Sequence, residues 1–141
     1  MAEYYADVFP DGRIHELLRM TMPDGSEAVI TARLELNGTD LLMVNGGPGN
    51  NTTFTEAFSL TIKCADQAEV DHFWNRFVGD GGQEVACGWC RDKFGVFWQV
   101  IPTGLPELLS DPDPERAKKA FESMQTMIKI DIDEIRRAAD A

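Results

Sequence analysis

The chain has 141 residues, the length of one ordinary domain, so a large multidomain assembly is excluded. Hydrophobic residues make up 43% of it and charged residues 26%, which excludes disordered and fibrous architectures. The 24 Asp and Glu outnumber the 13 Lys and Arg and give a net charge of -11. Because this charge repels phosphate backbones and anionic lipid surfaces, we expect neither nucleic acid nor a membrane as a partner.

Localisation is predicted from the absence of targeting signals and from the cysteines. No run of about 18 apolar residues is present to cross a bilayer, and the first residues, MAEYYADVFPDGR, lack both a basic start and an apolar core. Three cysteines are an odd number and a low density, which favours a reducing compartment over a disulfide framework. We therefore expect a cytoplasmic protein.

The first part of the chain is predicted to fold as one helix followed by three strands. Apolar spacing indicates a helix over 2–9, and alternation indicates strands over 13–22 and 28–36. In the first strand the alternation places four apolar side chains on one face: Ile14, Leu18, Met20 and Met22. Asn37-Gly38 is a strong hairpin signal because both residues tolerate positive φ, and it leads into a third apolar run over 41–44.

The second part begins after the segment GGPGNNTT, residues 46–53, whose composition is typical of a linker. A strand is expected over 58–64. The Asp66 to Glu69 spacing of a capping box then begins a helix with an apolar stripe that includes Phe73 and Phe77. Apolar stretches at 85–90 and 96–101 indicate two further strands, and a short extra strand is expected around Glu84.

Beyond Pro102 the pattern predicts two helical segments. Asp113 caps the first, with Pro114 at its first position, and the second is short and has Ile132 and Ile135 on one side. The first segment carries a stripe that is expected to cover a sheet or a partner; it consists of Ala117, Ala120, Phe121, Met124 and Ile128.

Together the two parts indicate two copies of a βαβββ unit, of which the first lacks its first strand. The runs NGGP, AFSLTIKCADQAEVDHFWNRFVGDGG, CGWCRDKFGVFWQVIP and LSDPDPERAKKAFESMQTMIKIDIDEI resemble the PhnB-like family. That family belongs to the vicinal oxygen chelate superfamily of glyoxalases and bleomycin-resistance proteins, and some members carry the name 3-demethylubiquinone-9 3-methyltransferase. The resemblance implies an α+β fold of paired βαβββ modules around a concave pocket, and homodimers.

The domain organisation that follows is a single domain over 1–141. Within it we expect module 1 at 1–47, a linker at 48–53, module 2 at 54–102 and a helical tail at 103–141.

Metal ligands in the superfamily come from the first and last strands of the modules. By motif, the matching positions are Ser59, Gln99, and Met43 or Asn45, and the fourth lies on the strand that this chain lacks. Transition metals prefer imidazole, thiolate or carboxylate donors, so we expect no metal and no other cofactor. The predicted lining of the pocket is Met43, Asn45, Ser59, Thr61, Trp89, Phe97 and Gln99.

Other constellations have ordinary interpretations. Cys87 and Cys90 form a C-x-x-C motif, but a hairpin is expected to follow it instead of the helix that thioredoxin-like chemistry needs. His15 and His72 lie off the apolar faces of their elements and are expected on the surface. The glycine-rich turn at 46–49 leads to a strand, whereas a loop that binds phosphate or adenosylmethionine needs a helix next.

The function expected from the sequence is binding of a small organic molecule, with the ligand unidentified, by a homodimer. The alternative is an enzyme of the superfamily, either a metal-dependent lyase or dioxygenase or a methyltransferase. A remote alternative is a thiol redox protein that uses Cys87 and Cys90.

Overall fold

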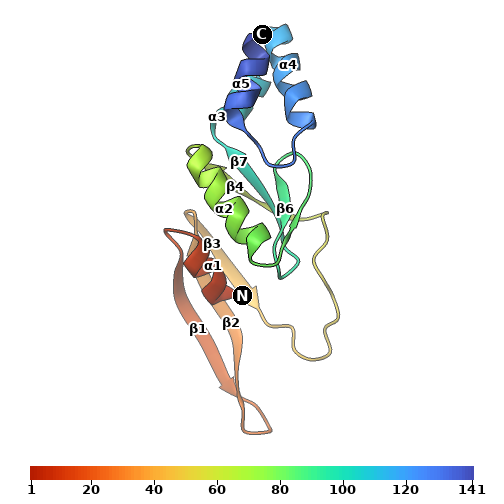
Figure 1. The fold of residues 1–141 in the computed structure, drawn as a ribbon. Coiled ribbons are helices and arrows are strands. Elements are labelled where there is room, and N and C mark those ends of the chain that lie inside the picture. The colour runs from red at the N-terminus through yellow and green to blue at the C-terminus, as the bar shows by residue number, and fades with distance from the viewer. The chain divides into compact units, whose positions relative to one another are not determined.

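The computed structural model describes residues 1–141, and the chain forms two compact units, unit 1 at Met1–Thr53 and unit 2 at Phe54–Ala141 (Figure 1). Residues 45–58, which include the predicted linker, form no helix or strand. None of the helices is both long enough and apolar enough to cross a bilayer.

Unit 1 is a three-stranded antiparallel sheet with one helix packed on it. The elements are α1 (Ala2–Val8), β1 (Arg13–Thr21), β2 (Glu27–Leu36) and β3 (Thr39–Val44), and the strand order is β1-β2-β3. Tyr5 and Val8 of α1 are fully buried, as is Leu34 of β2. The predicted helix and three strands are confirmed.

The hairpin between β2 and β3 forms as its sequence predicts. Asn37 and Gly38 both adopt positive φ, 51° and 74°. The Asp11 carboxylate accepts hydrogen bonds from both of their backbone N–H groups, at 3.0 and 3.1 Å. This contact ties the hairpin to the turn that follows α1.

The predicted face of β1 is wrong. Register shifts between Ile14 and Glu16 and between Leu18 and Arg19 interrupt the alternation. Ile14 pairs with the buried Leu34, whereas Leu18 pairs with Thr31 and is 46% exposed. Because an irregularity of one residue turns the following side chains to the other face, Ile14 and Leu18 lie on opposite sides.

Unit 2 contains a complete βαβββ module. The elements are β4 (Ser59–Cys64), α2 (Gln67–Gly79), β5 (Gln83–Glu84), β6 (Trp89–Arg91) and β7 (Phe97–Pro102). The strand order is β4-β7-β6-β5, with β4 parallel to β7 and the other pairs antiparallel. This arrangement confirms the predicted module. The three-stranded sheet of unit 1 has no strand that corresponds to β4, as the sequence also predicted.

Helix α2 begins at a capping box, as predicted. The Asp66 carboxylate accepts from the backbone N–H of Glu69 at 2.9 Å, and the Glu69 carboxylate accepts from that of Ala65 at 2.7 Å. The apolar stripe of the helix is buried, and the Phe77 ring stacks on Trp98 of β7 at a centroid distance of 4.8 Å. This stacking fixes the helix to one face of the sheet.

The strand predicted over 85–90 is mostly wrong. β6 begins only at Trp89, and the preceding residues form a turn in which Cys87 and Gly88 have φ of 54° and 82°. A Cβ at Gly88 would lie 2.8 Å from Cγ1 of Ile130. The close approach of the C-terminal segment therefore requires glycine here, a constraint that apolar patterning does not reveal.

The tail has three helices, α3 (Gly104–Leu109), α4 (Pro114–Gln125) and α5 (Ile132–Asp140), where the sequence predicted two. Gly104 and Pro106 in the short α3 hide its helical pattern. The predicted stripe is also partly wrong, because α4 ends at Gln125 and Phe121 is 47% exposed. The tail has a small core of its own, made of Leu105, Ala120, Ile130, Ile132, Ile135 and Ala139.

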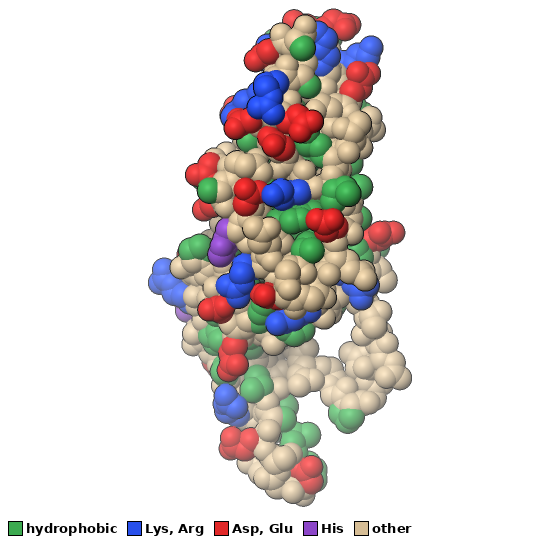
Figure 2. Space-filling model, in the orientation of Figure 1, with side chains coloured by type: hydrophobic (Ala, Val, Ile, Leu, Met, Phe, Trp, Pro, Cys, Tyr) green, Lys and Arg blue, Asp and Glu red, His purple; other side chains and the backbone are tan.

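Charged side chains of both signs are interspersed over the visible surface (Figure 2). In the tail, Arg116 pairs with Asp111 at 3.1 Å and also with Asp140. These two ion pairs partly neutralise the acidic side chains of the tail.

Candidate functional site

The sheet of unit 2 has one face covered by α2 and a second face that α2 leaves free. Ile62, Trp98 and Val100 point to the helix side and are at most 2% exposed. Because side chains alternate along a strand, Ser59, Phe97 and Gln99 point the other way, and all three are half-buried.

Five predicted pocket residues come together on this second face. The register pairs Ser59 with Phe97 across β4 and β7, and it places Gln99 between Thr61 on β4 and Trp89 on β6. We call this group the site face, made of Ser59, Thr61, Trp89, Phe97 and Gln99. Thr61 is exposed and the other four are half-buried.

A polar pair lies within the site face. The Gln99 side-chain amide donates to the Ser59 hydroxyl oxygen at 2.9 Å. A hydroxyl has one hydrogen to donate, and an amide carbonyl oxygen can accept, so Ser59 retains a donor and Gln99 an acceptor. The two groups lie beside the aromatic side chains of Phe97 and Trp89. This combination can orient a flat apolar molecule that carries polar substituents on one edge.

The donors of the site face do not fit the divalent ion that the resemblance implies. Ser59 and Gln99 are neutral, and each is engaged with the other. The chain brings no group of three or more His, Cys, Asp or Glu side chains together in a geometry that could hold a metal ion.

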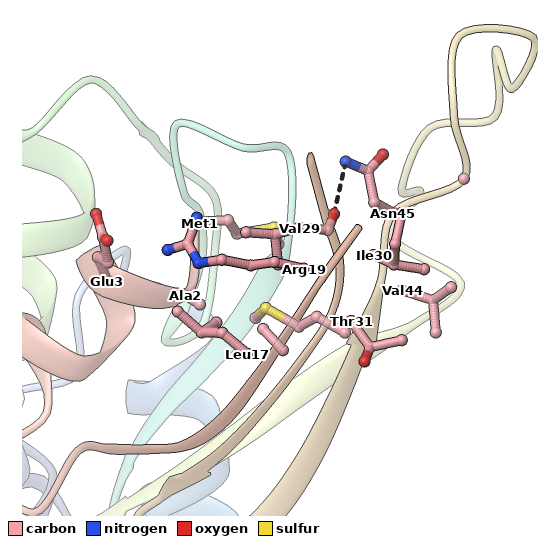
Figure 3. Close-up of a pocket in the computed structure, with 13 residues that line it drawn as sticks. Met1, Ala2, Glu3, Leu17, Arg19, Val29, Ile30, Thr31, Val44 and Asn45 are labelled. Carbon is pink, nitrogen blue, oxygen red and sulfur yellow. Dashed lines mark hydrogen bonds between the residues drawn. The ribbon is translucent and has the colours of Figure 1, made fainter. Parts of the chain in front are cut away.

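Met43 and Asn45, the other two predicted pocket residues, lie in unit 1. Both line a cavity of about 490 Å³ near the start of α1 and the end of β3 (Figure 3). The Asn45 side chain is bound locally, since its amide donates to the Val29 carbonyl at 3.3 Å and its oxygen accepts from Gly47 N–H at 3.2 Å. The remaining lining is Met1, Ala2, Glu3, Leu17, Arg19, Val29, Ile30, Thr31, Ala32, Val44 and Gly46.

The cysteines do not form a redox pair in the structure. All three are free thiols, and Cys90 is fully buried on β6. Burial, reinforced by the charge of Asp92, raises the pKa of Cys90 to about 12. A thiol with such a pKa has almost no thiolate at neutral pH, so it is a poor nucleophile.

Both histidines are on the surface, as predicted. His15 lies 3.1 Å from the Glu35 carboxylate across β1 and β2, and His72 is exposed beside Phe73. The turn at 46–49 is followed by β4 and not by a helix, so it lacks the element that a phosphate loop needs.

Asp92 has a structural role that was not predicted from the sequence. This carboxylate is only 2% exposed, and its Oδ1 accepts from the backbone N–H groups of Phe94 and Val96 at 2.8 and 3.1 Å. Its Oδ2 accepts from the Trp98 indole at 2.8 Å. Asp92 thus organises the turn between β6 and β7 and holds Trp98, which lies next to Gln99. The only sequence signal was an Asp at the start of a turn.

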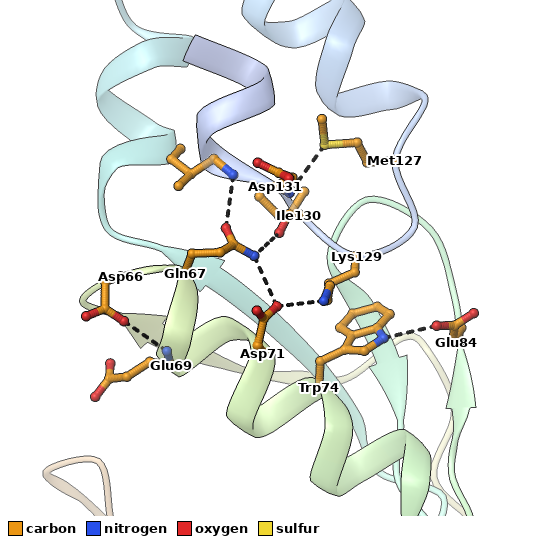
Figure 4. Close-up of polar contacts among 11 residues, drawn as sticks. Asp66, Gln67, Glu69, Asp71, Trp74, Glu84, Met127, Lys129, Ile130 and Asp131 are labelled. Atoms are coloured by element: carbon orange, nitrogen blue, oxygen red, sulfur yellow. Dashed lines mark hydrogen bonds and ion pairs between the residues drawn. The ribbon is translucent and has the colours of Figure 1, made fainter. Parts of the chain in front are cut away.

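A second missed feature is the polar network that joins α2 to the tail (Figure 4). The Gln67 amide donates to the Ile130 carbonyl at 2.9 Å, and its oxygen accepts from Ile132 N–H at 3.1 Å. Asp71 pairs with Lys129 at 2.6 Å. Gln67 also donates to Asp71 at 3.2 Å, so the contacts form one network. The tail is therefore fastened to α2 by polar groups as well as by its apolar core.

Comparison with known proteins places the chain in a family. The family model described as 3-demethylubiquinone-9 3-methyltransferase matches residues 1–101. Among solved structures, a PhnB protein from Bacillus cereus, assigned provisionally by its name to the same methyltransferases, is 28% identical with a TM-score of 0.64. The match covers 72% of this chain and 87% of that protein. Comparison with curated protein sequences gives no match. The chain therefore belongs to the PhnB-like, 3-demethylubiquinone-9 3-methyltransferase-like family, and it has the glyoxalase-like fold that the sequence predicted.

Proposed function

We propose that this PhnB-like protein belongs to the vicinal oxygen chelate superfamily and binds a small organic molecule on the site face without a resident metal. The observation that carries the proposal is the Ser59–Gln99 hydrogen bond beside Phe97 and Trp89 on a half-buried sheet face. Four half-buried side chains on three strands give a rigid platform, because each strand is fixed by its ladder.

The residues favour a particular class of ligand. Aromatic side chains favour a planar apolar body, and the free donor of Ser59 and the free acceptor of Gln99 favour a hydroxyl or carbonyl group at its edge. We therefore propose phenols and quinones of one or two rings as the ligand class. A formal charge on the ligand would be unfavourable, since neither Ser59 nor Gln99 carries an opposite charge to offset its desolvation.

An enzyme is the second candidate, and the family description favours methyl transfer to a demethylated quinone precursor. In that case the site face would hold the phenolic acceptor, and a methyl donor would bind beside it. The Ser59 and Gln99 groups could position a hydroxyl but are weak bases, so proton removal would need help from the substrate or solvent.

A binding screen with a turnover arm separates these candidates. Thermal unfolding is followed with phenols, catechols and short-chain quinones, with and without S-adenosylmethionine. A compound that raises the melting temperature and is recovered unchanged supports binding, whereas a methylated product supports the enzyme. If no phenol or quinone stabilises the protein at millimolar concentration, the ligand class proposed here is wrong.

The homodimer expected from the resemblance remains a prediction. Light scattering on the purified chain tests it, and a monomer at micromolar concentration would contradict it.

A further inference from the structure

The charged side chains that the strands of unit 2 present beside the site face are all cations. Because side chains alternate along each strand, the side of the sheet that carries the site face also presents four further residues: Lys63 on β4, Ile101 on β7, Arg91 on β6 and Gln83 on β5. No Asp or Glu of these strands points to this side, although the chain has 24 acidic and 13 basic residues. This distribution favours a negative charge on the molecule that binds there.

Arg91 lies beside the aromatic residues of the site face. The register pairs it with Phe97 across β6 and β7, and Trp89 precedes it by two residues on β6. Ser59 pairs with Phe97 from the opposite side, on β4. Neighbouring strands lie about 4.8 Å apart, so the backbones of Ser59 and Arg91 are about 10 Å apart, with Phe97 between them. A ring placed over Phe97 has the Ser59–Gln99 pair at one edge and Arg91 at the other.

The Arg91 guanidinium has donors to spare. Its Nη1 donates to the Gln83 side-chain oxygen at 3.5 Å, and it forms no ion pair with a carboxylate of the chain. A guanidinium carries several N–H donors in a planar fork that matches the two oxygens of a carboxylate. Lys63, the other cation, pairs with Ile101 and not with an aromatic residue. Arg91 is therefore the cation placed to contact a ligand that rests on Phe97 and Trp89.

We propose that the molecule bound on the site face is an aryl acid, and that Arg91 determines this specificity by binding its carboxylate. The aryl acid is a phenol or quinone that carries the carboxylate on a short chain, opposite the hydroxyl or carbonyl group that Ser59 and Gln99 hold. This inference rests on the proposed function and narrows its ligand class. A charge beside the neutral Ser59 and Gln99 would be unfavourable, whereas a carboxylate beyond Phe97 has Arg91 to offset its desolvation.

A matched pair of ligands tests the proposal on the intact chain. The probes are para-hydroxyphenylpropionate and its uncharged amide, para-hydroxyphenylpropionamide, which share the ring, the hydroxyl group and the spacer. Isothermal titration calorimetry at pH 7 measures both affinities. We expect the acid to bind about fivefold more tightly than the amide, as suits a partly exposed ion pair. Added salt should reduce this ratio, because salt screens such a pair.

Two matched variants isolate the contribution of Arg91. Arg91→Gln removes the charge and should lower the affinity for the acid about fivefold, while the affinity for the amide stays within about twofold. Lys63→Gln removes the other cation, which lies outside the site face, and should leave both affinities unchanged. The ratio of the two affinities separates recognition of the carboxylate from a structural effect, because a distorted site face would lower both affinities together.

Three results would overturn the proposal. Equal affinities for the acid and the amide, or an equal loss of both in Arg91→Gln, would refute the role of Arg91 and leave the proposed binding function standing. Equal effects of Arg91→Gln and Lys63→Gln would show that net charge, and not a contact with Arg91, selects the acid. Binding of neither compound at millimolar concentration would contradict the binding function itself, and the role of Arg91 with it.

Discussion

Replacement of Asp92 by asparagine tests how the turn between β6 and β7 supports the site face. Asparagine keeps the Oδ1 acceptor for Phe94 and Val96 but turns an NH₂ group toward the Trp98 indole N–H, so two donors oppose each other in a buried place. An unsatisfied buried donor costs about 1–3 kcal/mol, and we expect D92N to lower the free energy of unfolding of unit 2 by about 2 kcal/mol.

Urea denaturation followed by tryptophan fluorescence measures this loss, and thermal unfolding should show a melting temperature lower by about 8–16 °C for a unit of this size. Asp113→Asn is the matched control, since Asp113 accepts one backbone bond at the exposed start of α4 and asparagine caps helices equally well. A D92N protein within about 0.5 kcal/mol of the wild type would refute the argument that Asp92 holds Trp98.

Further predictions follow from the site face, the network and the thiols. Gln99→Leu removes the polar anchor and should lower the affinity for any phenol or quinone found in the screen about tenfold. Lys63→Ala, on the exposed end of β4, should leave that affinity unchanged. A larger loss of affinity in Lys63→Ala than in Gln99→Leu would contradict the site. The pKa of Asp71 is lowered, chiefly by the hydrogen bond from the Lys129 ammonium, so its contribution to stability is present above about pH 4 and is lost as the pH falls through the lowered pKa. The stability gap between wild type and Asp71→Asn should accordingly be largest above pH 5, at about 0.5–1 kcal/mol for a partly exposed pair, and should close at lower pH in urea titrations; a gap independent of pH would rule out the pair. A maleimide at pH 8 should modify the half-buried Cys87 at least tenfold faster than Cys90, and mass spectrometry measures both rates. Equal rates, or a disulfide between the two cysteines after mild oxidation, would support the thiol redox function instead.

Elements whose signals are local could be predicted from the sequence. The capping box at Asp66 and Glu69 and the hairpin at Asn37-Gly38 are determined by contacts within a few residues, and both form as predicted. The repeated βαβββ pattern then predicted the order of elements in unit 2, whereas no local signal specifies the parallel pairing of β4 with β7.

Features set by distant contacts could not be predicted in this way. The register shifts of β1 depend on how β2 pairs with it, and the turn at Cys87 and Gly88 depends on the approach of Ile130. Asp92 resembles any exposed turn residue until the burial of Trp98 is known. The local sequence of these residues does not reveal the distant contacts that determine their conformation.

The candidate site could be predicted only in part. Ser59 and Gln99 are 40 residues apart, and alternation together with the family resemblance placed them on one face, where they are hydrogen-bonded. Alternation within β3 did not reveal that the Asn45 side chain is engaged with Val29 and Gly47. Met43 and Asn45 line a separate cavity within unit 1.

The most direct test of the proposed binding function is nuclear magnetic resonance mapping of a stabilising phenol or quinone on the labelled protein. We expect the Gln99 side-chain amide and the Trp89 indole to shift most. The Trp98 indole, which is buried under α2 and bonded to Asp92, should shift little. Shifts centred on Met43 and Asn45 in unit 1, with the Gln99 amide unaffected, would contradict the proposed function.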